Sequence, residues 1–493
     1  MDKNSSGQNK SNKVLFGLGW SSISTIFNGL SQILRLSILA RFLEKEDFGI
    51  VAILTLILGF TQVFSDMGFS AAIMSEKKLS KSNFISLYWL QFIVFNSILI
   101  VGSLASPLVA VYYEEASLVY LVPLMLSELF FFSIGKLYDT VLQKQFRFKI
   151  IAIRNIVASV FSLLLAIVLA QLGAGVYSMI LSTISQCIIV NFWNFISGQK
   201  TYKLKLQKIK IKEVRPLLKV GYYQMGAHII DYVAGEFDIF IISSFLGMGA
   251  VGVYNLAKDL VLKFTTVINT IVVKVMLPFL AEKNDDIRLL TQTFFTFIKY
   301  LSLINIPILG IVFLFPDVLV DIFYGSGYED AVTIVRIMSV WSLIVILNNP
   351  NGHVAVALKR TDITFAYTIL RLLILGSLLL LFARENIIYA ALTMVGSYFI
   401  MFIVNWYMLL YRLLHLKILD YARAFYKPLL SVCLIVFLCC TIRYLVNSER
   451  SLSLTLSLLC AYCLLYVAYL FLCEKDVVLK IKHSIHSFIN NKG

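Results

Sequence analysis

Residues 84–111, FISLYWLQFIVFNSILIVGSLASPLVAV, decide the fold class because no charged side chain interrupts this apolar stretch. About twenty such residues are enough for an α-helix to cross the hydrocarbon of a bilayer. A surface helix of a soluble protein would carry a charged or polar face over this length. The stretch therefore predicts a transmembrane helix.

Similar stretches fill the rest of the chain, which is 59% hydrophobic and 14% charged, with a mean hydropathy of +0.83. Soluble proteins carry about 25% charged residues and cannot bury this much apolar surface. We expect an all-α, polytopic membrane protein of about 14 transmembrane helices. The expected helices lie near residues 14–42, 48–74, 84–111, 118–142, 150–171, 174–198, 217–245, 250–280, 289–315, 328–352, 363–383, 387–411, 422–442 and 451–473.

The distribution of charge predicts how these helices are oriented. With Met1 inside, the segments on the cytoplasmic side hold 28 Lys and Arg residues, and the segments on the outer side hold 5. The bias never reverses along the chain, as the positive-inside rule requires. It predicts an even number of crossings, an uncleaved first helix and cytoplasmic termini. It also accounts for the net charge of +15 without a nucleic-acid partner.

A basic segment divides the chain near its middle. Residues 200–216 hold seven Lys and Arg residues, and we interpret them as a cytoplasmic linker whose lysines also fit contact with anionic membrane lipid. The predicted organisation is a six-helix N-terminal lobe at 1–199 and a six-helix C-terminal lobe at 217–412. Residues 413–493 are predicted to form two additional helices and a cytoplasmic tail.

The two lobes resemble each other at an offset of 203 residues. The segments Phe42-Leu43 and Phe48-Gly49-Ile50 match Phe245-Leu246 and Val251-Gly252-Val253. Polar residues follow one face of the first helix at 4-3-4-3 spacing, and most of their counterparts are polar as well. The residues are Ser21, Thr25, Asn28, Gln32 and Arg35, with counterparts Gln224, His228, Asp231, Gly235 and Asp238. Lobes with an even number of crossings are parallel repeats, and such transporters bind substrate between the repeats.

Several basic residues lie deep in the expected helices. A cation at mid-bilayer costs about 2.5–3.5 kcal/mol, so it faces a partner or a water-filled cavity. Excess cation in such a cavity favours an anionic substrate such as a diphosphate. The predicted substrate-binding residues are Arg35, Gln32, Asn28, Lys258, Lys263, Arg336 and Arg371. The predicted sites for a coupling proton or sodium ion are Asp66, His228, Asp231 and Asp238.

Other interpretations of these residues stay open. Asp259 and Lys263 stand four residues apart on one helix and can pair with each other. The neutral polar stripe can join helices through hydrogen bonds, and His228 can be a packing residue.

Four further basic residues lie nearer the cytoplasmic side. Arg154 and Lys219 are within about one turn of it and can snorkel to the interface, so we do not count them as substrate ligands. Lys136 and Lys274 lie within two or three turns of that side, and the sequence assigns them to neither group.

No catalytic or metal site emerges from the sequence. Six of the seven cysteines lie in the last two expected helices, and none stands at metal-ligand spacing from a histidine. A glycine-rich nucleotide loop and a nucleophile triad are also absent from the sequence. We therefore expect neither an enzyme nor a cofactor.

Several short segments of the chain form recognisable motifs. They are Leu39-Ala40-Arg41-Phe42-Leu43, Asp47-Phe48-Gly49, Asp66-Met67-Gly68-Phe69-Ser70-Ala71-Ala72-Ile73, Gln143-Lys144-Gln145-Phe146-Arg147-Phe148, Gly173-Ala174-Gly175-Val176 and Gly252-Val253-Tyr254-Asn255-Leu256-Ala257. These motifs resemble those of bacterial polysaccharide exporters, the Wzx-like, colanic-acid and teichuronic-acid exporters of the multidrug/oligosaccharidyl-lipid/polysaccharide flippase superfamily. The resemblance is clearest over residues 30–260.

This resemblance implies two six-helix lobes facing each other in a V, as in MATE- and MurJ-like transporters, plus two peripheral helices. It implies flipping of undecaprenyl-diphosphate-linked oligosaccharide repeat units across the bacterial inner membrane, from the cytoplasmic to the periplasmic leaflet, for surface polysaccharide assembly. It further implies coupling to H⁺ or Na⁺ and contact with polysaccharide polymerase machinery.

Two alternative functions are weighed against this one. A multidrug or toxin extruder of the same superfamily would need an acid-dominated cavity for cationic drugs, which the deep arginines and lysines oppose. A membrane polysaccharide polymerase or ligase would present a large outer loop with Arg and His. The longest outer loop here, between Asp317 and Asp330, is short and acidic.

Overall fold

The computed structural model describes residues 3–66, 68–76, 79–205, 207, 209–283, 285–446 and 452–475. Throughout these ranges the chain is helical with connecting turns, and no strand occurs in them. This confirms the all-α prediction. The predicted tail beyond residue 475 and the side chains of Lys219, Gln224 and Lys274 lie outside the described part.

Twelve helices of the described residues are long and apolar enough to cross a membrane. One of these spans, His228–Thr266, extends over 39 residues because it joins two arms of a longer helix. Helix α1 (Lys3–Leu39) is also long enough to cross a bilayer. The polytopic prediction is therefore confirmed, and the described helices are consistent with about fourteen crossings.

The first half of the chain follows the expected helices with breaks at specific residues. Its helices after α1 are α2 (Lys45–Asp66), α3 (Phe69–Ser75), α4 (Lys81–Leu104), α5 (Ser106–Tyr112), α6 (Leu118–Leu126), α7 (Glu128–Lys144), α8 (Phe148–Gln171) and α9 (Val176–Gly198). Gly68, in the left-handed region at φ 73°, separates α2 from α3. Pro107 lies in the first turn of α5, where its missing N–H is not needed.

One boundary prediction is wrong. The first helix was expected to begin near residue 14, but α1 begins at Lys3. The polar residues before residue 14 include no proline that would stop the helix from extending.

The second half begins with α10 (Ile211–Glu282), a 72-residue element broken at Gly247. Gly247 has φ 80° and ψ 173°, a backbone conformation open to glycine, and it separates the two helices expected at 217–245 and 250–280. The remaining elements are α11 (Ile287–Leu314), α12 (Pro316–Tyr324), α13 (Asp330–Ala357), α14 (Thr361–Phe382), α15 (Ile387–Asn405), the π-helical turn η1 (Trp406–Tyr411), α16 (Arg412–Leu414), α17 (Ile418–Arg423), α18 (Tyr426–Val446) and α19 (Leu452–Cys473).

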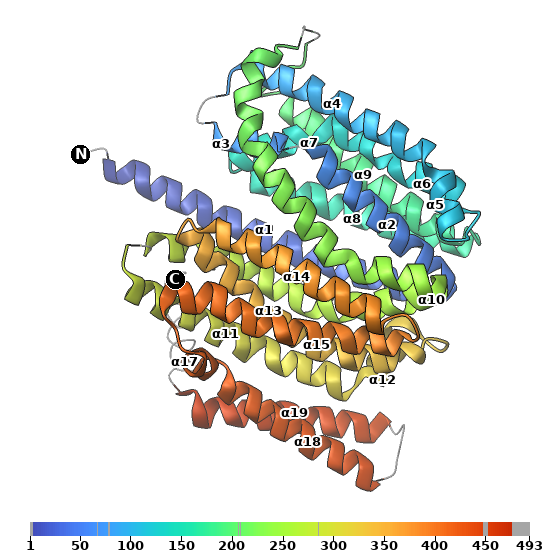
Figure 1. Cartoon of the computed structure of the whole chain (residues 1–493), viewed down its shortest axis with the longest axis vertical. Helices are drawn as coiled ribbons and strands as arrows, with labels where there is room; N and C mark the ends of the chain where they lie inside the picture. Colours follow the sequence, from blue (N-terminus) through green and yellow to red (C-terminus); the bar gives the residue numbers. More distant parts are fainter. Residues whose placement is uncertain are drawn as a thin grey trace, which may run out of the picture. The chain divides into compact units, whose positions relative to one another are not determined.

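The chain forms two compact units. Unit 1 comprises residues 1–263, 320–334 and 365–397, and unit 2 comprises 264–319, 335–364 and 398–493. In unit 1, α7 packs against α4 and α9, and α8 packs against α1 and α9 (Figure 1). The predicted division into lobes at the basic linker is a different division of the chain and stays a prediction.

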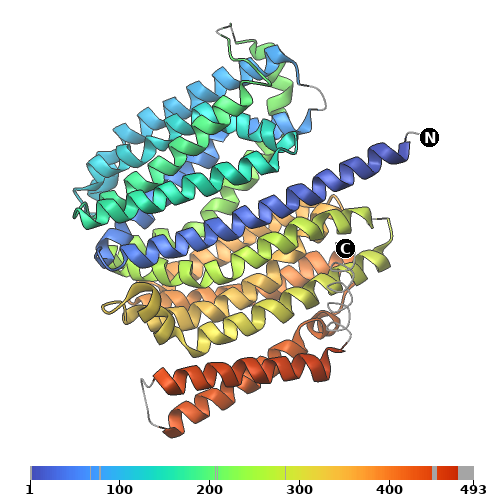
Figure 2. The same cartoon turned by 180° about the vertical axis from the view of Figure 1, so that it is seen from behind.

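In unit 2, the last two helices lie side by side in both views of the ribbon, and α18 packs against α11 (Figure 2). Pro307 removes the N–H that would bond to the Leu303 carbonyl within α11. The Tyr466 hydroxyl of α19 donates to that carbonyl oxygen at 2.7 Å. Tyr462 donates to the Pro307 carbonyl at 2.9 Å. Two tyrosines of α19 therefore satisfy the carbonyls around a proline kink.

A close approach of two glycines supports the 203-residue repeat. A Cβ atom added at Gly49 would lie 2.0 Å from the Met248 carbonyl oxygen. A Cβ added at Gly252 would lie 1.9 Å from the Lys45 carbonyl oxygen. The offset of 203 exchanges these two contacts, since it maps residue 45 onto 248 and residue 49 onto 252. The start of α2 and the second arm of α10 therefore cross backbone to backbone through equivalent glycines.

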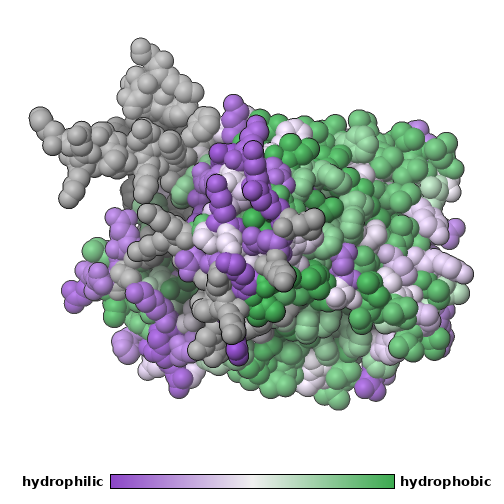
Figure 3. All heavy atoms as spheres, turned by 90° about the horizontal axis from the view of Figure 1, so that it is seen from above, coloured by the Kyte–Doolittle hydropathy of each residue, from purple (hydrophilic) through white to green (hydrophobic). Residues whose placement is uncertain are grey.

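Apolar side chains remain exposed along the outer face of unit 1. On α4 and α5 they include Ile100, Val101, Leu104 and Leu108, which are between 59% and 76% exposed. Figure 3 shows one face of the molecule, where hydrophobic residues cover a broad area and hydrophilic residues gather toward one end. Exposed apolar surface on long helices is what contact with lipid requires.

Candidate functional site

A pocket of about 830 Å³ lies within unit 1, among α2, α3, α4, α7 and the first arm of α10. This volume is in the range of small-molecule and cofactor sites, about 300–1,000 Å³. The lining residues are Gln62, Val63, Asp66, Gly68, Ser70, Met74, Phe95, Phe132, Lys136, Met225, His228, Asp231 and Tyr232. The pocket therefore unites three of the four residues predicted to bind a coupling ion: Asp66, His228 and Asp231.

The pocket includes Asp66 and Lys136, which lie near the ends of α2 and α7. Asp66 is the last residue of α2, and Lys136 lies two turns before Lys144 at the end of α7. The Ser70 hydroxyl donates to Asp66 Oδ1 at 2.8 Å, across the turn made by Gly68. The Lys136 ammonium forms no hydrogen bond or ion pair with any residue in the described ranges, so its charge is available to the pocket.

Arg371 of α14 supplies a second cation at the pocket. Its Nη2 donates to Asp231 Oδ1 at 2.8 Å and to the Asp231 carbonyl at 3.3 Å. The Asp231 side chain is 62% exposed, whereas that of Arg371 is 16% exposed. Two carboxylates, Asp66 and Asp231, thus stand against two cations, Lys136 and Arg371, and the pocket is not dominated by acid.

Tyr232 forms part of the pocket wall by reaching across to α2. Its hydroxyl donates to the Leu56 carbonyl at 2.9 Å. A Cβ at Gly59 would lie 2.2 Å from this hydroxyl, so the glycine provides the space for the tyrosine. Because the donor and acceptor lie 176 positions apart, the sequence pattern had no means of pairing them.

The polar face of α1 is directed mainly at neighbouring helices of unit 1. Ser159 of α8 donates to Asn28 Oδ1 at 2.6 Å, and Arg35 Nη1 donates to Ser162 Oγ at 3.2 Å. Lys263 donates to Gln32 Oε1. None of the five polar residues on this face of α1 lines the pocket. The hydrogen bond between Ser159 and Asn28 matches the alternative in which neutral polar residues join helices.

Lys258 and Asp238 form a buried ion pair between the two arms of α10. The Lys258 ammonium lies 2.8 Å from Asp238 Oδ2 and 3.1 Å from Oδ1. Tyr254 donates to Asp238 Oδ2 at 2.7 Å. The structure places the two side chains in contact with each other and outside the pocket lining, and their predicted roles in binding substrate and ion stay predictions.

Arg336 belongs to unit 2 and is not among the residues that line the pocket. Its side chain is exposed, and Nε donates to the Phe313 carbonyl at 3.4 Å. Its predicted role in substrate binding stays a prediction.

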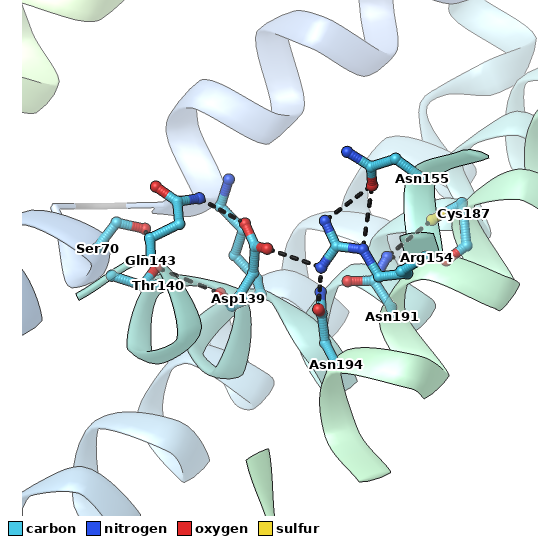
Figure 4. Close-up of polar contacts among 10 residues, drawn as sticks. Ser70, Asp139, Thr140, Gln143, Arg154, Asn155, Cys187, Asn191 and Asn194 are labelled. Carbon is cyan, nitrogen blue, oxygen red and sulfur yellow. Dashed lines mark hydrogen bonds and ion pairs between the residues drawn. The ribbon is translucent and has the colours of Figure 1, made fainter. Parts of the chain in front are cut away.

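Arg154 does not snorkel to the interface but is buried within the protein. Its side chain is only 4% exposed and pairs with Asp139 of α7 at 2.8 Å. Asn155 accepts from Nε at 3.0 Å, and Asn194 of α9 accepts from Nη1 (Figure 4). The sequence gives helix depth, but it could not show that polar partners from α7 and α9 meet the guanidinium within the protein.

The residues that the sequence missed are mainly uncharged. Phe95, Phe132 and Met225 line the pocket, but aromatic and Met side chains in apolar helices give no distinct signal. Lys136 could have been selected from the sequence, because a lysine within an apolar helix is costly unless it faces a partner or a water-filled cavity.

Comparison with known proteins identifies related chains. A family model described as "Polysaccharide biosynthesis protein" matches residues 38–333. The teichuronic acid biosynthesis protein TuaB of Bacillus subtilis (strain 168) is 27% identical over 425 residues, covering 85% of this chain and 86% of TuaB. The lipopolysaccharide biosynthesis protein WzxC of Escherichia coli (strain K12) is 23% identical over 359 residues, covering 73% of each chain.

A solved structure shares the fold. The lipid II flippase MurJ, in an inward closed conformation, matches with a TM-score of 0.75 at 16% identity, over 93% of this chain and 99% of that chain. At this identity the match concerns the fold alone, and it confirms the predicted MurJ-like class of membrane fold.

Proposed function

The chain belongs to the polysaccharide biosynthesis protein family, and from this premise we propose that it is a flippase for lipid-linked oligosaccharides. In this proposal it moves undecaprenyl-diphosphate-linked repeat units from the cytoplasmic to the periplasmic leaflet of a bacterial inner membrane. TuaB is named for teichuronic acid biosynthesis, WzxC for lipopolysaccharide biosynthesis and MurJ as a lipid II flippase. Movement across a bilayer needs no catalytic residue, in keeping with a transporter that is not an enzyme.

The observation that carries the proposal is the pocket between α2, α7 and α10. It lies within membrane-spanning helices, and it contains a lysine without a counter-ion among the described residues. A lysine ammonium is a phosphate ligand, and charge-assisted hydrogen bonds to phosphate are strong in a low-dielectric site. In this mechanism Lys136 and Arg371 attract the diphosphate at the basic end of the helices, which we assign to the cytoplasm.

The residues predicted from the sequence enter this mechanism in two groups. Asp66, His228 and Asp231 line the pocket and are the proposed sites for a coupling H⁺ or Na⁺. Lys263 and Arg35 lie outside the pocket lining and are proposed to meet the substrate at a later stage of an alternating-access cycle. Contact with polysaccharide polymerase machinery on the periplasmic side is part of the same proposal.

The charge balance of the pocket weighs against export of cationic drugs. Arg371 pairs with Asp231, and Lys136 shares the pocket with Asp66. An extruder of cations would leave its carboxylates available to the substrate. We therefore prefer an anionic lipid substrate to a cationic drug.

Charge reversal tests this proposal. Lys136→Glu and Arg371→Glu should each slow flipping of a fluorescent diphosphate-linked oligosaccharide in proteoliposomes by about 10–100-fold, because a charge-assisted hydrogen bond contributes about 1.5–3 kcal/mol. Arg147→Glu serves as a matched control, since Arg147 is exposed at the start of α8 and lies outside the pocket lining. Wild-type flipping rates in both pocket variants would refute the assignment of the diphosphate site.

A further inference from the structure

Glu128 is a buried carboxyl near the middle of a membrane span. It is the first residue of α7, it is 3% exposed, and it belongs to the span Leu118–Lys144. At 1.5 Å per residue it lies about 15 Å from the Leu118 end, which is half of a hydrocarbon core about 30 Å thick. Ionisable residues at this depth face a partner or a function.

One oxygen of the Glu128 carboxyl has no hydrogen-bond donor among the described residues. This oxygen, Oε1, is fully enclosed. The neighbouring Cys187 thiol of α9 lies 3.7 Å from the Glu128 backbone carbonyl and donates to it. A buried acceptor without a donor is costly, and an ionised one more so, unless it binds a proton or a cation.

Arg35 and Glu128 are coupled electrostatically. The electrostatic partners of Arg35 are Glu128 and, more weakly, Asp259 of α10. The guanidinium donates to Ser162 Oγ at 3.2 Å, and no carboxylate in the described ranges lies within 4 Å of it. Arg35 therefore forms no direct ion pair with Glu128 within the described ranges, and the one side-chain donor of Arg35 with a hydrogen bond there is Nη1, to Ser162.

Glu128 also continues the pocket wall along α7. Positions 128, 132 and 136 follow at intervals of four residues, which places them along one face of the helix. Phe132 and Lys136 line the pocket. The carboxyl thus lies one turn beyond the lining residues on the same face.

We infer that Glu128 is a proton-binding site whose occupancy is set by Arg35. While the guanidinium stays near, the carboxylate is ionised. When Arg35 turns to an anionic ligand, Glu128 loses its counter-charge and takes up one proton from water, which forms the O–H bond of the neutral carboxyl. When the ligand leaves, Arg35 returns and the proton is released. The anionic ligand is the diphosphate of the lipid-linked oligosaccharide, so this part of the inference rests on the proposed function.

The first test of the inference needs no ligand. Arg35→Gln removes the cation and should leave Glu128 protonated at neutral pH in the purified full chain. Its infrared spectrum should gain the C=O stretch of a buried protonated carboxyl. The band should vanish in Arg35→Gln/Glu128→Gln and persist in Arg35→Gln/Glu114→Gln, because Glu114 is exposed in the turn after α5. Identical spectra of the first double variant and its Arg35→Gln parent would overturn the inference.

The second test uses farnesyl diphosphate as the probe and a pH-indicator dye in weakly buffered detergent solution. Binding to the wild type should take up about one proton per chain, as linkage requires. Glu128→Gln should bind the probe without proton uptake, and Arg35→Lys should retain uptake because it retains the charge. Uptake by Glu128→Gln equal to that of the wild type would overturn the inference.

The two tests separate the inference from the proposed function. Failure of the wild type to bind farnesyl diphosphate would count against the anionic lipid substrate. The infrared result for Arg35→Gln would still decide whether Glu128 binds a proton under the control of Arg35.

Discussion

The buried pair between Lys258 and Asp238 offers the sharpest measurement of energetics in this chain. The ammonium lies 2.8 Å from the nearer carboxylate oxygen, and the two side chains are 8% and 1% exposed. Glu236 Oε2 lies farther away, at 3.9 Å from the same ammonium. Replacing Asp238 by Asn removes the closer charge and retains a carbonyl oxygen for the Tyr254 hydroxyl.

The size of the loss follows from these distances. With an effective dielectric constant near 20, a charge pair at 2.8 Å gains about 6 kcal/mol and one at 3.9 Å about 4 kcal/mol. Glu236 therefore compensates in part for the missing carboxylate. Breaking a buried pair costs about 3–5 kcal/mol, and we expect Asp238→Asn to fall near the lower limit, about 3 kcal/mol. The double variant Lys258→Met/Asp238→Asn should recover most of this loss, since it removes the uncompensated charge.

An exposed pair of nearly the same length provides the matched control. Lys45 and Asp330 lie 2.7 Å apart, but their side chains are 31% and 73% exposed. Asp330→Asn should cost at most about 1 kcal/mol, because solvent screens exposed pairs. The assay is unfolding by SDS titration from a mild detergent, followed by circular dichroism. Equal losses for Asp238→Asn and Asp330→Asn would show that burial does not set the strength of the pair.

Two further predictions concern the backbone. Gly252→Ala should destabilise the chain and impair transport, because its Cβ would lie 1.9 Å from the Lys45 carbonyl oxygen; Gly226→Ala, with no atom within 4 Å, should leave the SDS midpoint unchanged or slightly higher. Tyr466→Phe should cost about 1–3 kcal/mol in the same titration, since it leaves the carbonyl freed by Pro307 without a donor. In a Pro307→Ala background the restored N–H of residue 307 can donate to the Leu303 carbonyl, so Tyr466→Phe should cost less there. An equally large loss in the two backgrounds would contradict this reasoning.

Apolar length and periodicity determined much of the fold. Stretches such as residues 84–111 have no stable soluble form, so membrane helices follow from composition. Breaks within helices were harder to locate. Gly247 separates two expected helices, but only its non-helical backbone angles, φ 80° and ψ 173°, show that the break between the two arms of α10 falls at this residue. The start of α1 was not predicted because the polar residues before residue 14 are compatible with either a helix or a loop.

The candidate site was predicted in part, for a physical reason. Helical periodicity shows on which face of its helix a residue lies. Its depth in the membrane determines the free-energy cost of a charged side chain there. Both quantities are local, so they selected Asp66, His228 and Asp231, which do line one pocket. Neither quantity identifies a partner on another helix. The sequence therefore predicted a substrate ligand at Lys258 but could not show that its counter-ion is Asp238, which lies 20 positions earlier in the chain.

The sequence by itself determined that this chain is an all-α membrane protein with a duplicated pattern and charged residues deep in its helices. Tertiary structure alone decided how each charge is compensated. Arg371 meets Asp231 across 140 positions, and Arg154 is enclosed by polar groups from two other helices. Lys136 lacks a counter-ion among the described residues, and Glu128 lacks a donor to Oε1. The reason is that the energy of a buried charge depends on atoms within a few ångströms, which packing brings from distant parts of the chain.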